Sequence, residues 1–342
     1  MKLWLAFLIL IMAASSPAQS QTPFYQGKTI RIVTGYPAGD VNDLWPRLVT
    51  QHMGKYIPGH PSFIVQNMPG ASSMIAANYV YNVAKPDGLT LGWIAPTLYF
   101  DQLVGRKEVQ YDWGKYTFIG SPSPSDHLLY MRSDSPYQSI EDIRRHPEAP
   151  KCGSGGPTGT GYYLPKLLDE TLGAKFTIVL GYQGGGPIDL AVEKGEIHCR
   201  AMTIESFFAR EPFHTWRKNN FVRILVQTTK KRSPRMPDTP TIYELMDQYK
   251  TPDEARRVAA VILAGGGFGR PMVAPAGVPS DRLKTLQSAF LSALNDPLLK
   301  VEAEKRGYEW DPVGGAELAK LAKEVMSQPP PVIERMKKVL GQ

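Results

Sequence analysis

The sequence has few of the residues from which metal sites and disulfide frameworks are built. It contains two cysteines, Cys152 and Cys199, and six histidines in 342 residues. Neither C-x-x-C nor H-E-x-x-H occurs, so these common zinc-site motifs are absent. His198 and Cys199 would have to join the distant Cys152 at a metal, and three scattered ligands without motif spacing are a poor basis for a site. We therefore expect no metal and no cofactor.

Long hydrophobic runs are missing beyond the N-terminus. The apolar run from Leu3 to Ala14 is followed by small residues that include Ala18-Gln19-Ser20. The run is shorter than the roughly 20 residues that span a bilayer, and the small-x-small pattern is typical of a signal peptidase site. We expect residues 1–20 to be a cleaved secretory signal, which leaves a soluble, exported protein. The alternative is an N-terminal membrane anchor.

Signatures of nucleotide and hydrolase chemistry are also lacking. No glycine loop ends in Lys-Ser or Lys-Thr as a P-loop requires, and Gly70–Met74 lacks the last glycine of a G-x-S-x-G elbow. No histidine stands in a motif with an acid or a nucleophile. The net charge is +7, but the tightest basic cluster, Lys230–Arg232, is short, so we expect no nucleic-acid partner.

Alternating strand-like and helix-like segments are what the sequence does contain. The chain is 42% hydrophobic and 21% charged, as is typical of globular proteins, and it is long enough for two domains. Strands alternating with helices predict an α/β protein with mostly parallel sheets covered by helices. The first unit has a strand at Thr29–Thr34 and then a helix with Asp43 as its N-cap, which would place Pro46 harmlessly in the first turn.

Several loops of small residues follow the predicted strands. Ligands of such sheets bind beyond the carboxyl ends of the strands, and small residues let an anion approach the unpaired N–H groups of a helix start. A glycine turn that binds nothing is the alternative for any one loop. Several loops on one rim favour a binding site. They are Gly35–Asp43, Met68–Ser72, Ala95–Thr97, Ser154–Gly161 and Tyr182–Gly186.

Apolar spacing gives three further predictions. Ile75, Tyr79 and Val83 recur at helical spacing and predict one face of a helix. Trp93 lies inside a predicted strand, which favours core packing. The apolar part of Asp247–Pro271 predicts a buried helix or strand.

The loop sequences together resemble one family. NMPGAS at Asn67–Ser72, the Pro-Asp-Gly before the third strand and the Asn-Asp-Pro at Asn295–Pro297 are similar to the Bug-type extracytoplasmic solute receptors, the binding proteins of tripartite tricarboxylate transporters. The resemblance runs in order from about Gly27 to the C-terminus. It implies a non-enzymatic periplasmic receptor, which we expect to be a monomer, that passes a small organic acid to the subunits of a cognate membrane transporter.

The resemblance also implies a two-lobed, type II periplasmic-binding fold. The chain would cross between the lobes near Ser121–Ser125 and Gln227–Lys230, so that residues 21–122 and 228–342 form lobe I and residues 123–227 form lobe II. The ligand would lie in the cleft between them. Carried over by position, the ligand-binding residues would be Tyr36, Pro37, Gly39, Asp40, Asn42, Pro69, Gly70, Ala71, Ser72 and Thr97 in lobe I, and Ser154, Gly155, Thr158, Gly159, Thr160, Tyr182 and Glu205 in lobe II. Tyr36 and Tyr182 could wall the cleft or belong to the core.

Two departures from the family pattern leave alternatives open. Asp40 puts a negative charge where the family has a glycine run, so either Asp40 points outward or the ligand carries a cation or a hydroxyl there. Cys152 and Cys199 would lie on neighbouring strands, either bridged or as two buried thiols. The residues also do not separate a transport receptor from a receptor that reports to a sensor kinase. An exported hydrolase that uses Ser72 would need a histidine within hydrogen-bond reach of it.

Overall fold

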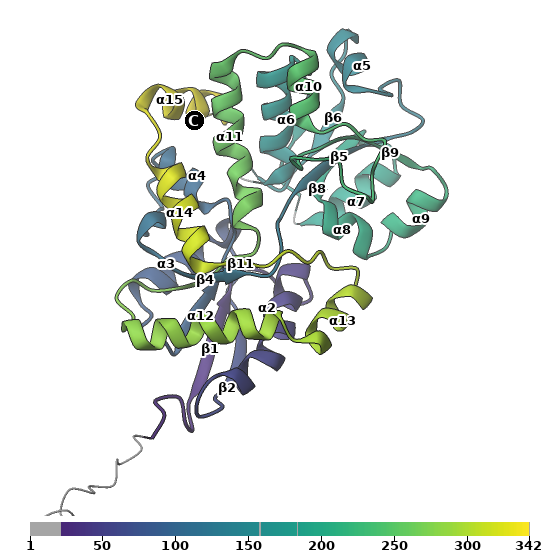
Figure 1. Cartoon of the computed structure of the whole chain (residues 1–342). Coiled ribbons are helices and arrows are strands. Elements are labelled where there is room, and N and C mark those ends of the chain that lie inside the picture. The colour runs from purple at the N-terminus through teal and green to yellow at the C-terminus, as the bar shows by residue number, and fades with distance from the viewer. Residues whose placement is uncertain (1–21, 157–158, 183, 342) are drawn as a thin grey trace, which may run out of the picture.

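The computed structural model describes residues 22–156, 159–182 and 184–341. The predicted signal at residues 1–20 and the predicted site residue Thr158 lie outside these ranges. Two sheets organise the chain, and helices surround both of them (Figure 1). Among the described residues, no helix combines the length and the apolar character needed to cross a bilayer.

Sheet A joins the N-terminal part of the chain to two short strands from its C-terminal part. The strand order is β11-β4-β10-β3-β1-β2. β1 pairs in parallel with β2 and β3, whereas β10 is antiparallel to β3 and β4, and β11 is antiparallel to β4. The strands are β1 (Thr29–Thr34), β2 (Ser62–Asn67), β3 (Thr90–Trp93), β4 (Thr117–Ser121), β10 (Met272–Ala274) and β11 (Val313–Gly314).

Sheet B is built from the middle of the chain. Its order is β7-β6-β8-β5-β9, with β6 parallel to β7 and β8, and β5 antiparallel to β8 and β9. The strands are β5 (His127–Arg132), β6 (Lys151–Gly153), β7 (Thr177–Val179), β8 (Cys199–Thr203) and β9 (Val222–Gln227).

The predicted α/β class is confirmed, and each sheet is mostly parallel in strand direction. Among the described strands, β1 to β4 run one way in sheet A and β6 to β9 run one way in sheet B. The reversed strands are β5 in sheet B and β10 and β11 in sheet A. Of these, β5 and β10 are the first that the chain forms after it passes from one sheet to the other. A crossing strand enters its new sheet from the side of the old one, so its direction is opposite to that of strands connected by local helices.

Helices fill the connections between the strands and the C-terminal third. They are α2 (Val41–Met53), α3 (Met74–Asn82), α4 (Leu98–Leu103), α5 (Ile140–Arg145), α6 (Thr160–Leu172), α7 (Gly185–Glu193), α8 (Ile204–Ala209), α9 (Phe213–Lys218), α10 (Ile242–Gln248), α11 (Asp253–Phe268), α12 (Ser280–Leu294), α13 (Pro297–Lys305), α14 (Gly315–Met326) and α15 (Pro330–Val339), with short 3-10 turns at Gly54–Tyr56, Ala71–Ser73 and Trp113–Lys115.

Helix α2 begins earlier than the sequence predicted. Its N-cap is Asp40, not Asp43, because an Asp40 carboxylate oxygen accepts a hydrogen bond from the Asn42 backbone N–H at 2.8 Å. Pro46 therefore lies inside the helix and not in its first turn, so that prediction was wrong. The earlier start is favoured because a carboxylate at the N-cap satisfies an otherwise unpaired N–H and complements the helix dipole.

Helix α3 also turns a different face to the core. Ile75 and Val83 are 50% and 63% exposed, so the predicted stripe is not the buried one. The buried residues are Met74, Ala76, Ala77 and Val80. A Cβ on Gly92 of β3 would lie 3.1 Å from the Val80 side chain, which shows how closely α3 lies on sheet A. The face that carries Ala76 and Ala77 is the buried one because small side chains let α3 lie close to sheet A.

The segment Asp247–Pro271 contains α11, which confirms the buried helix as one of the two predicted forms. In Figure 1, α11 runs beside α6 and α14, and the strand that follows it, β10, returns the chain to sheet A. One apolar cluster includes Val33 of sheet A, Leu129 of sheet B, and Val258 and Ile262 of α11. Helix α11 therefore packs in an apolar core to which both sheets contribute. Trp93 is fully buried in a second cluster, as predicted.

Candidate functional site

The loops that follow β1, β2 and β3 lie at one edge of sheet A, because these strands are parallel. Side chains tie the loops to one another. The side-chain amide of Asn67, the last residue of β2, donates to the Tyr36 carbonyl after β1 at 2.9 Å. Ser73 Oγ accepts from the Ala95 N–H after β3 at 3.1 Å. A Cβ on Gly35 would lie 1.8 Å from Ser73 Oγ, so only glycine allows this approach. Nine of the predicted residues are on these loops or on the first turns of their helices: Tyr36, Pro37, Gly39, Asp40, Asn42, Pro69, Gly70, Ala71 and Ser72, with Thr97 after β3 as a tenth.

The loop after β2 has an unusual backbone. Gly70 and the three residues that follow it, Ala71, Ser72 and Ser73, all have positive φ angles, of 137°, 46°, 54° and 78°. Left-handed conformations cost about 1–2 kcal/mol for each residue with a side chain. Pro69, Ala71 and Ser72 are exposed at this turn. Strain of this kind persists only where the surroundings fix it, and it is common at ligand-binding loops.

Two carboxylates occupy the start of α2. One Asp40 oxygen accepts from the backbone and the side-chain amide of Asn42, at 2.8 and 2.9 Å. Asp43 accepts from the Gly39 N–H at 2.9 Å and from both Arg47 and Asn67. Burial opposes the ionisation of Asp43, but the hydrogen bonds from Arg47 and Gly39 outweigh it and hold its pKa below the usual value. The N–H groups of this helix start are thus largely satisfied by the chain itself.

The loops at the carboxyl ends of β6 and β7 approach one another at the edge of sheet B. A Cβ on Gly155 would lie 3.0 Å from the Tyr182 carbonyl, and one on Gly153 would lie 3.3 Å from the Tyr182 ring. Ser154 is buried and donates its hydroxyl to the Gly156 carbonyl at 2.9 Å. Gly159 is the N-cap residue of α6, and Thr160 is its first residue. The predicted residues of this half are therefore brought together, apart from Thr158, which the structure does not describe.

Glu205 connects the two halves. It lies in α8, directly after β8 of sheet B, and its side chain is fully buried. One carboxylate oxygen accepts from Trp45 Nε1 at 3.0 Å and lies 3.2 Å from Arg270 Nη2, and the other accepts from the Glu309 N–H at 3.1 Å. Trp45 is in α2, the helix after β1, so this contact places the loop-bearing edges of the two sheets face to face.

Sequence reasoning missed Arg270, Trp45 and Glu309. Arg270 also donates to Ser123 Oγ at 2.8 Å and to the Pro124 carbonyl at 2.9 Å, in the segment that connects β4 to β5. One signal in the sequence could have drawn attention to it. Arg270 is the only charged residue between Arg257 and Asp281, and an isolated charge in an apolar stretch is often buried and paired.

A comparison with known protein families identifies the family to which this chain belongs. The model of the tripartite tricarboxylate transporter family receptor, TctC, matches residues 47–337. The chain belongs to the TctC receptor family. The family and the fold are those of non-enzymatic solute-binding receptors, so the hydrolase hypothesis is wrong.

Individual relatives agree with this assignment over the whole length. A Cupriavidus necator protein, "UPF0065 protein in gbd 5'region", is 26% identical over 328 residues, which are 94% of this chain and 92% of the relative. MatC from Rhodopseudomonas palustris with bound malate has a TM-score of 0.65 at 21% identity and covers 92% of this chain and 99% of its own. Another R. palustris protein, with adipate, has a TM-score of 0.67 at 21% identity and covers 92% of this chain and 97% of its own. The two-lobed receptor fold is thus established.

Titratable groups gather around Arg270 in this TctC receptor. Burial raises the pKa of the Glu309 carboxyl to about 7, and the neighbouring Glu205 carboxylate adds to the increase, whereas Arg270 opposes it. Burial lowers the pKa of His127 to about 3, and the positive charge of Arg270 contributes. Burial and then Asp40 raise the pKa of Tyr36, again opposed by Arg270. These groups are close enough to share one electrostatic environment.

The two cysteines of the receptor are free. Cys152 and Cys199 lie opposite one another on β6 and β8, as expected, but both are buried thiols and no bridge joins them. The possible disulfide is therefore not formed, and the alternative of two buried thiols holds. Adjacent parallel strands seldom offer the Cβ geometry that a disulfide requires. Burial raises the pKa of the Cys199 thiol, so we expect it to be unreactive.

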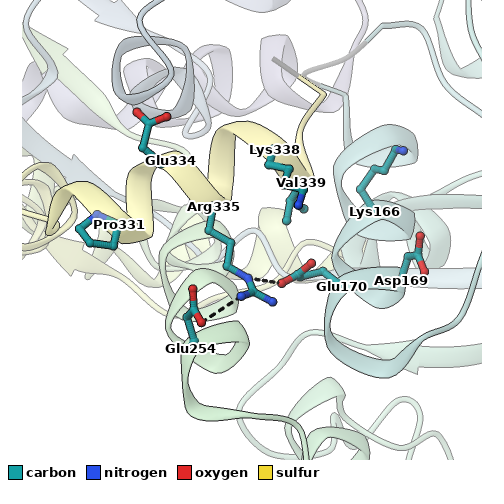
Figure 2. Close-up of a pocket in the computed structure, with 9 residues that line it drawn as sticks. All are labelled: Lys166, Asp169, Glu170, Glu254, Pro331, Glu334, Arg335, Lys338 and Val339. Atoms are coloured by element: carbon teal, nitrogen blue, oxygen red, sulfur yellow. Dashed lines mark hydrogen bonds and ion pairs between the residues drawn. The ribbon is translucent and has the colours of Figure 1, made fainter.

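Two hollows in the receptor surface lie away from the predicted site residues. The first, of about 620 Å³, is formed by α6, α11 and α15, and in Figure 2 Arg335 reaches both Glu170 and Glu254, at 2.6 and 2.9 Å. The second, of about 750 Å³, runs along edge strand β9. Among the described residues, no group of three or more His, Cys, Asp or Glu side chains is arranged to hold a metal.

Proposed function

We propose that this receptor captures a small organic acid, a carboxylate, in the periplasm and delivers it to a tripartite tricarboxylate-type membrane transporter. The proposal rests first on membership of the TctC family and on two relatives of the same fold that hold malate and adipate. Receptors of this family are periplasmic, and the N-terminal sequence is typical of an export signal.

The observation that carries the proposal is the contact of Glu205 with Trp45. It joins the residues that follow β8 of sheet B to the helix that follows β1 of sheet A, so the loops at both rims face the same space. A ligand between them would meet the N-termini of α3, α6 and α7, where the helix dipole favours an anion. The start of α2 is different, because Asp40 and Asp43 already use its N–H groups.

We assign the ligand contacts to the predicted residues of both rims other than Glu205, whose side chain is fully buried. Backbone N–H groups of the Gly70–Ser72 and Ser154–Thr160 loops would hold the carboxylate, with Ser72 and Thr160 hydroxyls beside them. Tyr36 and Tyr182 would form the walls. We also propose residues 21–122 and 228–342 as lobe I and residues 123–227 as lobe II, with α11 as the element that packs on both.

A thermal-shift titration of the purified protein tests ligand capture. Malate, adipate and a set of monocarboxylates would be titrated separately, and a ligand of the folded state stabilises by about 2.7 kcal/mol at a hundredfold excess over Kd. We expect a saturable rise in melting temperature from one carboxylate class. Ser72→Ala should weaken that response, whereas Ser62→Ala, at the opposite end of β2, should not. If no carboxylate raises the melting temperature, the proposal of a carboxylate receptor fails.

An uptake assay separates delivery to a transporter from a sensor role. Cells that lack the gene for this receptor should lose uptake of the labelled ligand, and the wild-type gene should restore it. Normal uptake together with a lost transcriptional response would instead support a receptor for a sensor kinase.

A further inference from the structure

Glu205 is held by donors from three separate segments on the sheet A side of the molecule. Trp45 comes from α2, Arg270 from the junction of α11 and β10, and Glu309 from the segment that connects α13 to β11. Glu205 itself follows β8 of sheet B. The side chains of Glu205 and Arg270 are 0% and 1% exposed, so the ion pair is almost completely shielded from solvent.

The partners of Glu205 are themselves fixed. Trp45 stacks on Tyr308 with ring centroids 4.8 Å apart and an angle of 30° between the planes. Arg270 is anchored to the connection between the sheets through Ser123 Oγ, the Pro124 carbonyl and a backbone bond from its own N–H to Ser121 Oγ. Trp45 and Arg270 thus each have further partners that do not involve Glu205.

A buried carboxylate needs all of its donors, because it has given up its hydration. Charge-assisted hydrogen bonds are about twice as strong as neutral ones, and here they are available in a single arrangement of the two sheets. Any rotation that moves α8 away from all three of these segments removes the donors together and exposes both charges to water. This geometry therefore selects one orientation between the lobes.

We propose that Glu205, with Trp45 and Arg270, forms an interlobe clasp that holds the lobes in the arrangement that encloses the ligand. Glu205 is then a positioning residue. It raises ligand affinity because it stabilises the closed arrangement of the lobes, and it does not contact the ligand itself. The link to ligand affinity rests on the proposed function, but the effect on the lobes does not.

The chain offers a matched control for this clasp. Asp189 in α7 pairs with Arg200 in β8, and their side chains are 4% and 12% exposed. This is also a buried ion pair, but both partners belong to the sheet B side. Loss of its charge should disturb lobe II without changing the orientation of the lobes.

Interlobe distances in the ligand-free protein test the clasp. Spin labels at Leu190→Cys in α7 and Leu298→Cys in α13, two exposed positions on opposite sides, would report the distance distribution. The native cysteines are buried and should stay unlabelled. We expect Glu205→Gln and Trp45→Phe to give longer and broader distances, and Asp189→Asn to match the wild type. Trp45→Phe keeps the test informative if Glu205→Gln does not fold.

The outcomes separate the clasp from other roles. Wild-type distances in both clasp variants, or an equal opening in Asp189→Asn, would overturn the proposal. Adipate serves as the probe of affinity. If the closed population falls to a tenth, the apparent Kd rises about tenfold. Weaker adipate binding with unchanged ligand-free distances would mean that Glu205 contacts the ligand directly, which also overturns the clasp. A failure of adipate to bind would count against the proposed ligand and leave the distance test standing.

Discussion

Replacement of Glu309 by glutamine should remove a loss of stability between pH 5 and pH 8. The Glu309 carboxyl is surrounded by Glu205, Arg270, Arg235 and Asp126, and burial with the charge of Glu205 raises its pKa from 4.5 to about 7. A carboxyl whose pKa is higher in the folded than in the unfolded state stabilises the fold while it is protonated. Its contribution is complete below pH 4.5 and is lost as the pH rises through 7.

The size of this effect follows from the two pKa values. They differ by about 2.5 pH units, from 4.5 to about 7, and each unit corresponds to about 1.4 kcal/mol. The upper bound is therefore about 3 kcal/mol, and about 2 kcal/mol is a better expectation because Glu309 is only partly buried. Glutamine has the shape of the protonated carboxyl, so Glu309→Gln should match the wild type at pH 5 and exceed its stability by about 2 kcal/mol at pH 8.

Urea denaturation of both proteins at several pH values measures the difference. Other titrating groups, among them His127 and Asp126, are present in both proteins, so their contributions largely cancel in the comparison. The reasoning predicts a difference in the free energy of unfolding that is near zero at pH 5 and grows through pH 7. A constant difference across this range, or a variant that becomes less stable as the pH rises, would refute the assignment of the raised pKa to Glu309.

Three further predictions concern other parts of the chain. Gly269→Ala should cost about 1–3 kcal/mol more than Gly105→Ala, because both have positive φ but only a Cβ on Gly269 would lie 2.0 Å from the Ser123 carbonyl. Urea denaturation of the two variants compares these losses, and equal losses would contradict the clash. Asp40→Ala should lose about 1 kcal/mol of stability as a helix cap, whereas Asp40→Asn should retain most of it in the same assay. Thiol titration without reductant should find no reactive thiol in the native protein and two after unfolding, and a count of zero after unfolding would mean a disulfide.

The glycine-rich loops and the strand–helix alternation were predictable because they depend on local sequence. The turn after β2 begins at Gly70 with a φ of 137°, a conformation that favours glycine whatever its distant neighbours are. Gly35 at the end of β1 is different, because the approach of Ser73 is what excludes a side chain there. Since β1, β2 and β3 are parallel, their loops meet at one edge without further information. This explains why the sequence alone could group the candidate site residues within each half.

Helix starts and buried faces were harder to predict. Asp40 and Asp43 are both good N-caps, and the choice between them depends on Arg47 and Asn67, which hold Asp43 in the first turn. The buried face of α3 depends on how closely Gly92 lets the helix approach sheet A. In each case a partner outside the segment decides between two local solutions of similar energy.

The sequence by itself determined the α/β class, the loops that can hold a ligand and the family to which the chain belongs, because these follow from short patterns of residues. Only the tertiary structure decided which charges are buried together. Trp45 and Glu205 are 160 positions apart, and the crossings between the sheets bring them into contact. A buried carboxylate is stable only beside its donors, and the position of distant donors is a property of the folded chain.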